Sequence, residues 1–271
     1  MSPIQTAGQV FEAVQKAKAG ATAYCTNFFP VESKLQNWID HDEMEMELHD
    51  GAAFFFRKDR NFLHFYFCAA DAMKLQQYIA ISSKIKMERI VTDLVGNEAA
   101  VTGLLPVLAP AGFQPYAQLQ RMARIGQPEA ASGDAQIGFA EKADNRAVLG
   151  LLENSFDRYA EQIPMLYEIE SAVDGRQILV ARRDNMLAGL LFFETQGLAS
   201  TVRFWTVAEQ FRSLKIGSAL MQCYLKTQKA VRRFTLWVNA NNENAIQKYR
   251  HYGYAPDGLI DLVLANKMIR S

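Results

Sequence analysis

Short apolar segments alternate with amphipathic ones along the second half of the chain, and this alternation limits the possible folds more than any other feature. Apolar residues recur three or four positions apart over 144–160, which indicates a helix. Strands that alternate with helices favour a sheet that is at least partly parallel. The pattern predicts an α/β fold with strands at 178–182, 187–194, 201–207, 234–238 and 260–267 and later helices at 216–229 and 244–251.

A segment rich in Gly, Pro, Ser and Ala at 126–135 has no apolar periodicity and predicts a linker. It divides the 271 residues into two portions of ordinary domain size, 1–125 and 136–271. A glycine and an aromatic residue separate a helix from a strand in both portions, at Gly112-Phe113 and at Gly253-Tyr254. This weak repeat is consistent with two related domains or with a common helix stop signal.

The composition argues against several classes of function. Lys plus Arg (29) balances Asp plus Glu (29), whereas nucleic-acid-binding proteins usually carry excess positive charge. No apolar run approaches the ~20 residues of a membrane-spanning helix, and the first residues lack the features of a signal peptide. The three cysteines, Cys25, Cys68 and Cys223, are far apart, which is typical of reduced thiols in a cytoplasmic protein. His41 and His49 match no zinc spacing, so we expect no metal. The balanced charge and the short apolar runs lead us to expect no nucleic-acid partner and no membrane partner.

The most informative stretch runs over 207–221, where a predicted strand ends in a polar turn and an apolar helix begins. The first N–H groups of a helix have no internal partner, and together with the helix dipole they form a site for an anion. Gly217 and Ser218 are small enough to let a phosphate approach the backbone, and Arg212 and Lys215 place two cations beside it. The local pattern leaves open an ordinary strand-to-helix turn with solvated basic side chains.

A second motif follows over 236–254, with a strand, a cluster of asparagines, a helix and a glycine before an aromatic residue. Asn242 is placed to cap the helix, and Ala245 and Tyr249 lie one turn apart on its inner face. Tyr249 is therefore either a core aromatic residue, which is the commoner fate of such a position, or part of a binding site.

The two motifs, in this order and at this separation, resemble those of the GNAT acetyltransferase superfamily. The family pattern has Arg/Gln-x-x-Gly-x-Gly/Ala at the start of a helix and then Asn-x-x-Ala-x-x-x-Tyr-x-x-x-Gly-Phe. The chain supplies Arg212-Ser-Leu-Lys-Ile-Gly217 and Asn242-Glu-Asn-Ala245-Ile-Gln-Lys-Tyr249-Arg-His-Tyr-Gly253-Tyr254. The resemblance covers about 137–271, half of the chain. It implies a mixed, mostly antiparallel twisted sheet, flanked by helices, with one splayed pair of parallel strands.

The resemblance also implies that acetyl-coenzyme A, as cosubstrate, lies in a split between strands 201–207 and 234–238. An amine then attacks the acetyl carbonyl directly, and Tyr249 donates a hydrogen bond or a proton to the departing sulfur. The residues implied in cofactor binding are Thr206, Val207, Arg212, Ser213, Leu214, Lys215, Ile216, Gly217, Ser218, Asn242 and Tyr249.

Such a reaction needs a base, because an alkyl amine with a pKa of about 10.4 is mostly charged at neutral pH. Losing that proton costs roughly 4–5 kcal/mol. Glu194, at the end of a predicted strand, and Glu209, just past the next one, are the candidates, although solvent exposure is the commoner fate of both positions. Cys223 lies within a predicted helix, which favours a core position over a nucleophile.

Two positions depart from the family pattern. Lys215 replaces the first glycine of the loop, and Ser213 follows Arg212 where glycine is frequent. A left-handed backbone would be unfavourable for lysine, whereas a helical backbone would tolerate it and add a cation for the pyrophosphate. We predict the helical conformation, because the family loop opens directly into the helix.

The first portion shows no comparable loop after any predicted strand. It resembles the degenerate partner domain of tandem GNAT proteins through its closing helix and Ala111-Gly-Phe113. We expect this portion to have lost cofactor binding and to wall off the acceptor site or cover a sheet edge. Acidic and apolar residues alternate over 41–50, and a solvated face is favoured there over an acidic wall that attracts an amine.

We therefore predict two tandem GNAT-like domains, at 1–125 and 136–271. The second is expected to be an acetyl-coenzyme A-dependent N-acetyltransferase that acts on a primary amine of a small molecule or a peptide. The alternative is a non-catalytic acyl-coenzyme A-binding or interaction module. A homodimer is compatible with either prediction.

Overall fold

The computed structural model describes residues 2–126 and 137–267. All of the predicted linker except Gly126 lies outside the described residues. The chain divides into two compact units: unit 1 comprises Met1–Leu119 and Gly258–Ser271, and unit 2 comprises Gln120–Asp257. No helix among the described residues is long and apolar enough to cross a membrane.

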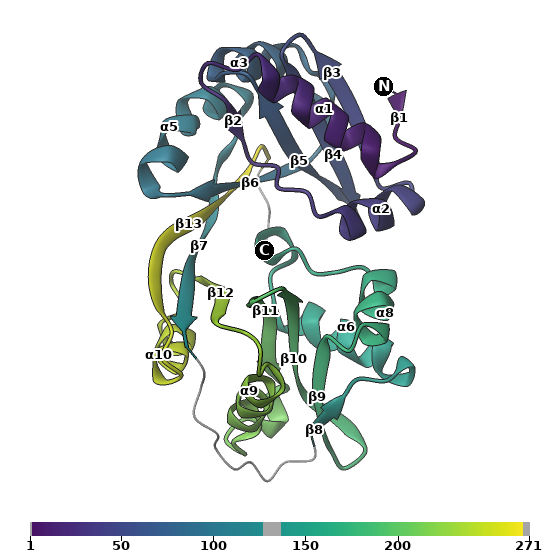
Figure 1. The fold of residues 1–271 in the computed structure, drawn as a ribbon, viewed down its shortest axis with the longest axis vertical. Helices are drawn as coiled ribbons and strands as arrows, with labels where there is room; N and C mark the ends of the chain where they lie inside the picture. Colours follow the sequence, from purple (N-terminus) through teal and green to yellow (C-terminus); the bar gives the residue numbers. More distant parts are fainter. Residues whose placement is uncertain (1, 127–136, 268–271) are drawn as a thin grey trace. The chain divides into compact units, whose positions relative to one another are not determined.

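Unit 1 is a twisted sheet with helices on both faces (Figure 1). Its strands follow the order β1-β3-β4-β5-β6-β13, and only β5 and β6 run parallel among these neighbours. Alternate residues of β4 point to opposite faces, so Phe54 and Phe56 pack with α3 and α5 while Phe55 packs with α1 and α2. The elements of this unit are β1 (Ser2–Pro3), α1 (Ala7–Ala19), β2 (Cys25–Thr26), α2 (Glu32–Asp40), β3 (Met44–His49), β4 (Ala52–Asp59), β5 (Phe62–Ala69), α3 (Ala72–Ile81), α4 (Ser83–Met87), β6 (Ile90–Gly96), α5 (Glu98–Leu108) and the first half of β7 (Gln114–Ile125).

Unit 2 repeats this architecture with the strand order β12-β11-β10-β9-β8, in which only β11 and β12 run parallel. Leu191 and Phe193 of β10 pack with α9 and α10, and Leu190 and Phe192 pack with α6 and α8 on the other face. Its elements are β8 (Ile137–Phe139), α6 (Asn145–Ser155), α7 (Arg158–Glu161), α8 (Leu166–Asp174), β9 (Ile178–Arg183), β10 (Met186–Gln196), β11 (Ala199–Val207), α9 (Ile216–Thr227), β12 (Arg233–Asn239) and α10 (Glu243–His251).

Each unit is completed by a strand from the other half of the sequence. β13 (Ala255–Ala265) pairs with β6 from Ile260↔Gly96 to Ala265↔Val91, and its Leu262 and Leu264 enter the core of unit 1. In return, the end of β7 belongs to unit 2, where the Gly126 N–H donates to the Arg232 carbonyl (3.0 Å). The predicted second domain, 136–271, includes the last strand, whereas the compact unit does not. Period-two alternation identifies a strand but not the sheet that it joins.

The structure bears on two local predictions, one for residues 144–160 and one for residues 41–50. The predicted helix over 144–160 is interrupted: α6 ends at Ser155, and Asp157 caps the short α7 by accepting a hydrogen bond from the Tyr159 N–H (2.8 Å). In β3 the predicted alternation places Met44 and Met46 in the core. Its acids form contacts within unit 1, since Glu45 pairs with Lys58 (3.2 Å) and with Lys84, and Glu47 accepts from the Tyr78 hydroxyl (3.0 Å).

Candidate active site

The site begins where two parallel strands separate. β11 and β12 pair from Ala199↔Arg233 to Val202↔Leu236, yet both strands continue beyond these residues. At this point β11 also contains a bulge: Phe192 and Phe193 of β10 face Phe204 and Val202, so Arg203 has no partner in the register. The edge of β11 beyond the bulge is therefore open on the side of β12.

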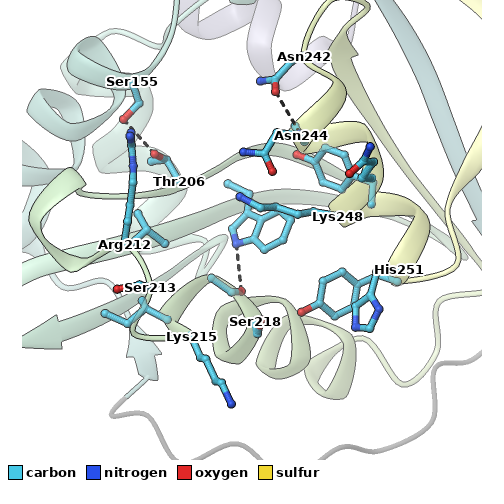
Figure 2. A pocket seen from close by; sticks show the side chains of 18 of the residues that line it. Ser155, Thr206, Arg212, Ser213, Lys215, Ser218, Asn242, Asn244, Lys248 and His251 are labelled. Atoms are coloured by element: carbon cyan, nitrogen blue, oxygen red, sulfur yellow. Dashed lines mark hydrogen bonds between the residues drawn. The ribbon is translucent and has the colours of Figure 1, made fainter.

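A cavity of about 900 Å³ lies at this opening (Figure 2). Its wall consists of the end of α6, the end of β11, the turn that follows β11, the first turn of α9 and one face of α10. Ten of the eleven residues implied in cofactor binding line it, and Leu214, which is 48% exposed, does not. The ten are Thr206, Val207, Arg212, Ser213, Lys215, Ile216, Gly217, Ser218, Asn242 and Tyr249.

The turn before α9 has an unusual backbone, and here the prediction of a helical conformation was wrong. Lys215 is the N-cap of α9 with φ 58°, and Ser213 has φ 75°. Both are therefore left-handed, a conformation that costs an L-residue other than glycine roughly 1–2 kcal/mol. The family glycines at such positions avoid this cost.

Replacing Lys215 by glycine is accordingly expected to stabilise unit 2 by about 1 kcal/mol, because glycine adopts positive φ without strain. The gain should appear as a higher urea midpoint. Lys226→Gly, in the last turn of the same helix, is the matched control and should instead destabilise by about 1 kcal/mol. Destabilisation by both substitutions would show that the Lys215 backbone is not strained.

The electrostatic character of the cavity is positive. The amides of Ile216, Gly217 and Ser218 lie in the first turn of α9, where no helical carbonyl reaches them. Arg212, Lys215 and Lys248 line the cavity, and the lining that the structure describes contains no carboxylate (Figure 2). The helix dipole adds to this field, so the arrangement favours a ligand with several negative charges.

Gly217 allows close packing at this helix terminus. The Trp205 indole N–H donates to the Gly217 carbonyl (3.1 Å), and a Cβ at position 217 would lie 3.3 Å from the Trp205 ring. Trp205, Lys248, Asn244 and Ser155 also line the cavity, and the motif analysis did not identify them. Lys248 and Asn244 lie inside the second motif, so helical spacing from Asn242 and Tyr249 could have revealed them.

Asn242 and Tyr249 each have a structural role and also line the cavity. The Asn242 side chain accepts a hydrogen bond from the Ala245 N–H (3.1 Å), as a cap should, while the residue also lines the cavity. Tyr249 is 8% exposed and packs in the core, with its ring centroid 5.4 Å from that of Trp205. Burial and the charge of Glu161 raise the pKa of Tyr249 above its usual range, so its hydroxyl stays protonated.

The two acids predicted as bases lie outside the cavity lining. The Glu209 side chain is 88% exposed and lies 4.0 Å from Arg212. Glu194 forms an ion pair with the bulged Arg203 (2.7 Å). Proximity to a strand end in the sequence does not fix the direction of a side chain, which explains both misplacements. Burial raises the pKa of the Cys223 thiol, which therefore stays protonated, as expected for a residue without a nucleophilic role.

In unit 1 the corresponding opening contains the chain itself. β5 and β6 pair at Leu63↔Ile90 and His64↔Val91 and then separate. Beyond that point the Asn27 side chain donates to the carbonyls of Phe65 (3.1 Å) and Asp93 (3.0 Å), and its Oδ1 accepts from the Phe67 N–H (2.7 Å). Asn27 is 6% exposed, so this segment fills the space between the two strands. Among the described residues, no group of three or more His, Cys, Asp or Glu side chains could hold a metal.

Comparison with known proteins agrees with this geometry. The family model of the acetyltransferase (GNAT) domain matches residues 174–256, from the end of α8 to the start of β13. No curated protein matches the chain.

Solved structures extend the similarity of fold to both units. A tandem GNAT protein from the clavulanic acid biosynthesis pathway matches with a TM-score of 0.65 and 12% identity, covering 98% of this chain and 96% of that one. A GNAT protein from Kribbella flavida matches with a TM-score of 0.59 and 15% identity over 87% of this chain and 93% of its own. A GNAT protein from Sphaerobacter thermophilus matches with a TM-score of 0.57 and 16% identity, covering 97% of this chain and 91% of that one.

Proposed function

Because the chain carries a GNAT acetyltransferase domain at residues 174–256, we propose that unit 2 binds acetyl-coenzyme A and transfers its acetyl group to a primary amine of a small molecule or a peptide. The observation that carries this proposal is the cavity between the diverging strands β11 and β12. Its volume of about 900 Å³ is within the ordinary range for a small-molecule site, and its lining joins one positively charged end to an open strand edge.

Each part of the donor has a matching surface. The diphosphate is held by the amides of Ile216–Ser218, with Arg212 and Lys215 beside it. The pantetheine arm, which carries amide groups, pairs with the backbone of Thr206 and Val207 along the open edge of β11. This extended pose directs the thioester toward Tyr249.

The reaction proceeds by direct attack. The unprotonated amine adds to the acetyl carbonyl, a C–N bond forms, and the C–S bond breaks with its electron pair moving to sulfur. The Tyr249 hydroxyl, which makes no hydrogen bond with the described residues, donates one to the developing thiolate. The second proton of the amine then passes to the sulfur, leaving an amide and the free thiol. Tyr249 remains protonated throughout, in keeping with its raised pKa.

The test is to incubate the protein with acetyl-coenzyme A and a panel of primary amines and to follow the release of free thiol. Amine-dependent release is expected for at least one member. Binding of the cofactor without release across a broad panel would favour a non-catalytic acyl-coenzyme A-binding module. The two left-handed residues at Ser213 and Lys215, where the family has glycine, keep that alternative worth testing.

We also expect one coenzyme A per chain. The opening in unit 2 is empty of protein, whereas Asn27 and its hydrogen bonds fill the one in unit 1. Isothermal titration calorimetry on the full chain should therefore give a stoichiometry of one. A stoichiometry of two would mean that a second coenzyme A displaces the Asn27 segment from the opening in unit 1.

A further inference from the structure

Two basic side chains of the cavity have no role in holding the diphosphate, the pantetheine arm or the thioester, and this inference about them rests on the proposed function. Lys248 and His251 both lie in the last turn of α10 and line the cavity. Together with Asn244 they are four and three residues apart, so they form one stripe along the helix. Figure 2 shows Lys248 and His251 on the α10 side of the cavity and Ser218 on the α9 side. The stripe therefore shares the cavity with the turn that is proposed to hold the diphosphate.

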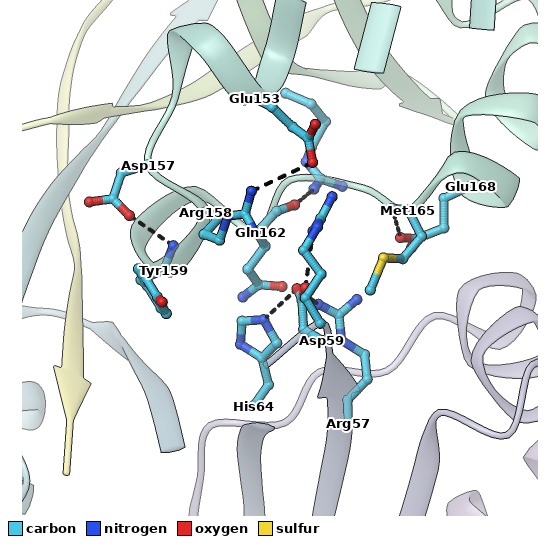
Figure 3. A network of polar contacts seen from close by, with 12 residues as sticks. Arg57, Asp59, His64, Glu153, Asp157, Arg158, Tyr159, Gln162, Met165 and Glu168 are labelled. Atoms are coloured by element: carbon cyan, nitrogen blue, oxygen red, sulfur yellow. Dashed lines mark hydrogen bonds and ion pairs between the residues drawn. The ribbon is translucent and has the colours of Figure 1, made fainter. Parts of the chain in front are cut away.

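Neither of these side chains has an acidic partner in the described structure. Lys248 and His251 are exposed, and neither forms an ion pair with a described residue. In α7, by contrast, Arg158 lies 3.6 Å from the Glu153 carboxylate (Figure 3). The helix dipole does not explain why the two side chains line the cavity, because Arg250 lies in the same turn and does not line it. An anionic group of a ligand is the partner that this stripe lacks.

Aromatic rings form the floor of the space between the two helices. The Trp205 indole N–H donates to the Gly217 carbonyl in the first turn of α9 (3.1 Å). The Trp205 ring lies 5.9 Å from the Tyr252 ring, and the Tyr252 ring lies 5.1 Å from the His251 ring, measured between centroids. All four residues line the cavity. These contacts run from the start of α9 to the last turn of α10, so a group bound over the rings lies between the two helix ends.

Coenzyme A has a third phosphate that matches this position. Its ribose carries the diphosphate on the 5′ oxygen and a phosphate monoester on the 3′ oxygen, and such a monoester has a charge of about −1.5 to −2 at pH 7. With the diphosphate at the amides of Ile216–Ser218, the pantetheine arm extends along β11 and the ribose lies on the other side of the diphosphate, over the aromatic floor. The 3′-phosphate is then within reach of the last turn of α10.

We propose that Lys248 and His251 bind the 3′-phosphate of coenzyme A and select the free nucleotide thioester over pantetheine thioesters that lack this group. The Lys248 ammonium donates a charge-assisted hydrogen bond to the phosphate, and a His251 ring nitrogen donates another. A pantetheine arm on a carrier protein is attached through a single phosphate and has no ribose. Such a thioester leaves the stripe on α10 without a partner, so it is a poor donor for this chain.

The test measures the affinity of the full chain for coenzyme A and for 3′-dephospho-coenzyme A by calorimetry. Wild type should bind coenzyme A about 10-fold more tightly, which is within the contribution of hydrogen bonds to charged groups. Lys248→Gln should weaken the binding of coenzyme A about 10-fold and leave the binding of 3′-dephospho-coenzyme A within about two-fold. His251→Gln should act in the same direction. Lys248→Arg keeps the charge and should keep most of the preference.

Two controls separate this role from a general effect of charge. Arg250→Gln removes a cation from the same turn of α10, and with it the same favourable interaction with the helix dipole, but Arg250 does not line the cavity. This variant should leave both affinities unchanged. The second control is 4′-phosphopantetheine, which lacks the ribose and should bind equally to wild type and K248Q.

The outcomes are distinct. No binding of coenzyme A by wild type would overturn the proposed function and this assignment together. Equal affinities of wild type for the two nucleotides, or an equal loss of both in K248Q, would overturn the assignment and leave the proposed transferase function standing. A change in K248Q that is confined to the KM of the acceptor amine would also overturn it, because Lys248 would then lie at the acceptor.

Discussion

Replacing Ser218 by aspartate should weaken coenzyme A binding about 100-fold while raising the melting temperature. Ser218 is exposed in the first turn of α9 and lines the cavity. A carboxylate there complements the helix dipole, which is worth about 0.3–1 kcal/mol of added stability. The same carboxylate repels a phosphate at roughly 5 Å by about 3 kcal/mol for an effective dielectric constant of about 20, which corresponds to a loss of about 100-fold in affinity.

The opposite signs of the two effects make this substitution informative. Ser218→Asn has nearly the same shape without the charge and should bind coenzyme A within a few-fold of wild type. Calorimetry measures the affinity and thermal unfolding measures the stability. If S218D bound coenzyme A as tightly as S218N, the diphosphate could not lie at the start of α9.

Replacing Tyr249 by phenylalanine should lower turnover by roughly 10–100-fold while coenzyme A affinity hardly changes. The hydroxyl is expected to act only when negative charge develops on sulfur, so its loss affects the transition state more than the bound cofactor. The fold should tolerate the change, because the ring packs against Trp205 and the hydroxyl makes no internal hydrogen bond in the described structure. Thiol-release kinetics and calorimetry measure the two quantities.

Tyr252→Phe is the matched control for Tyr249→Phe. Tyr252 lines the same cavity and its ring also contacts Trp205, with centroids 5.9 Å apart. Its hydroxyl has no part in the proposed chemistry, so turnover should stay within a few-fold of wild type. Equal turnover by Y249F and wild type would remove Tyr249 from the mechanism.

The residues that line the cavity could be predicted from the sequence because their determinants are local. A helix start with small residues and flanking cations, and an Asn and a Tyr seven residues apart on one helix, specify their own geometry once each helix forms. Gly217, Asn242 and Tyr249 accordingly come together around one cavity. The motif order also implied the parallel strand pair, which the structure shows separating after Val202 and Leu236.

The other features of the fold and of the site depend on tertiary contacts, which local sequence patterns do not predict. The left-handed backbone of Lys215 follows from the way in which the turn joins β11 to α9, and lysine itself does not favour it. The base was sought near strand ends, at Glu194 and Glu209, but neither side chain lines the cavity, because a position near a strand end does not fix where the side chain points. The pairing of β13 with β6 joins residues more than 160 positions apart, so the exchange of strands between the units was also missed.

The central claim is that main-chain amides at the start of α9 bind the diphosphate of coenzyme A. The most direct measurement is a titration of the ¹⁵N-labelled protein with coenzyme A, followed by amide chemical shifts. The largest saturable shifts are predicted for Ile216, Gly217 and Ser218, with none of comparable size around Asn27. Unchanged shifts at these three amides with millimolar coenzyme A, or saturable shifts confined to unit 1, would contradict the claim.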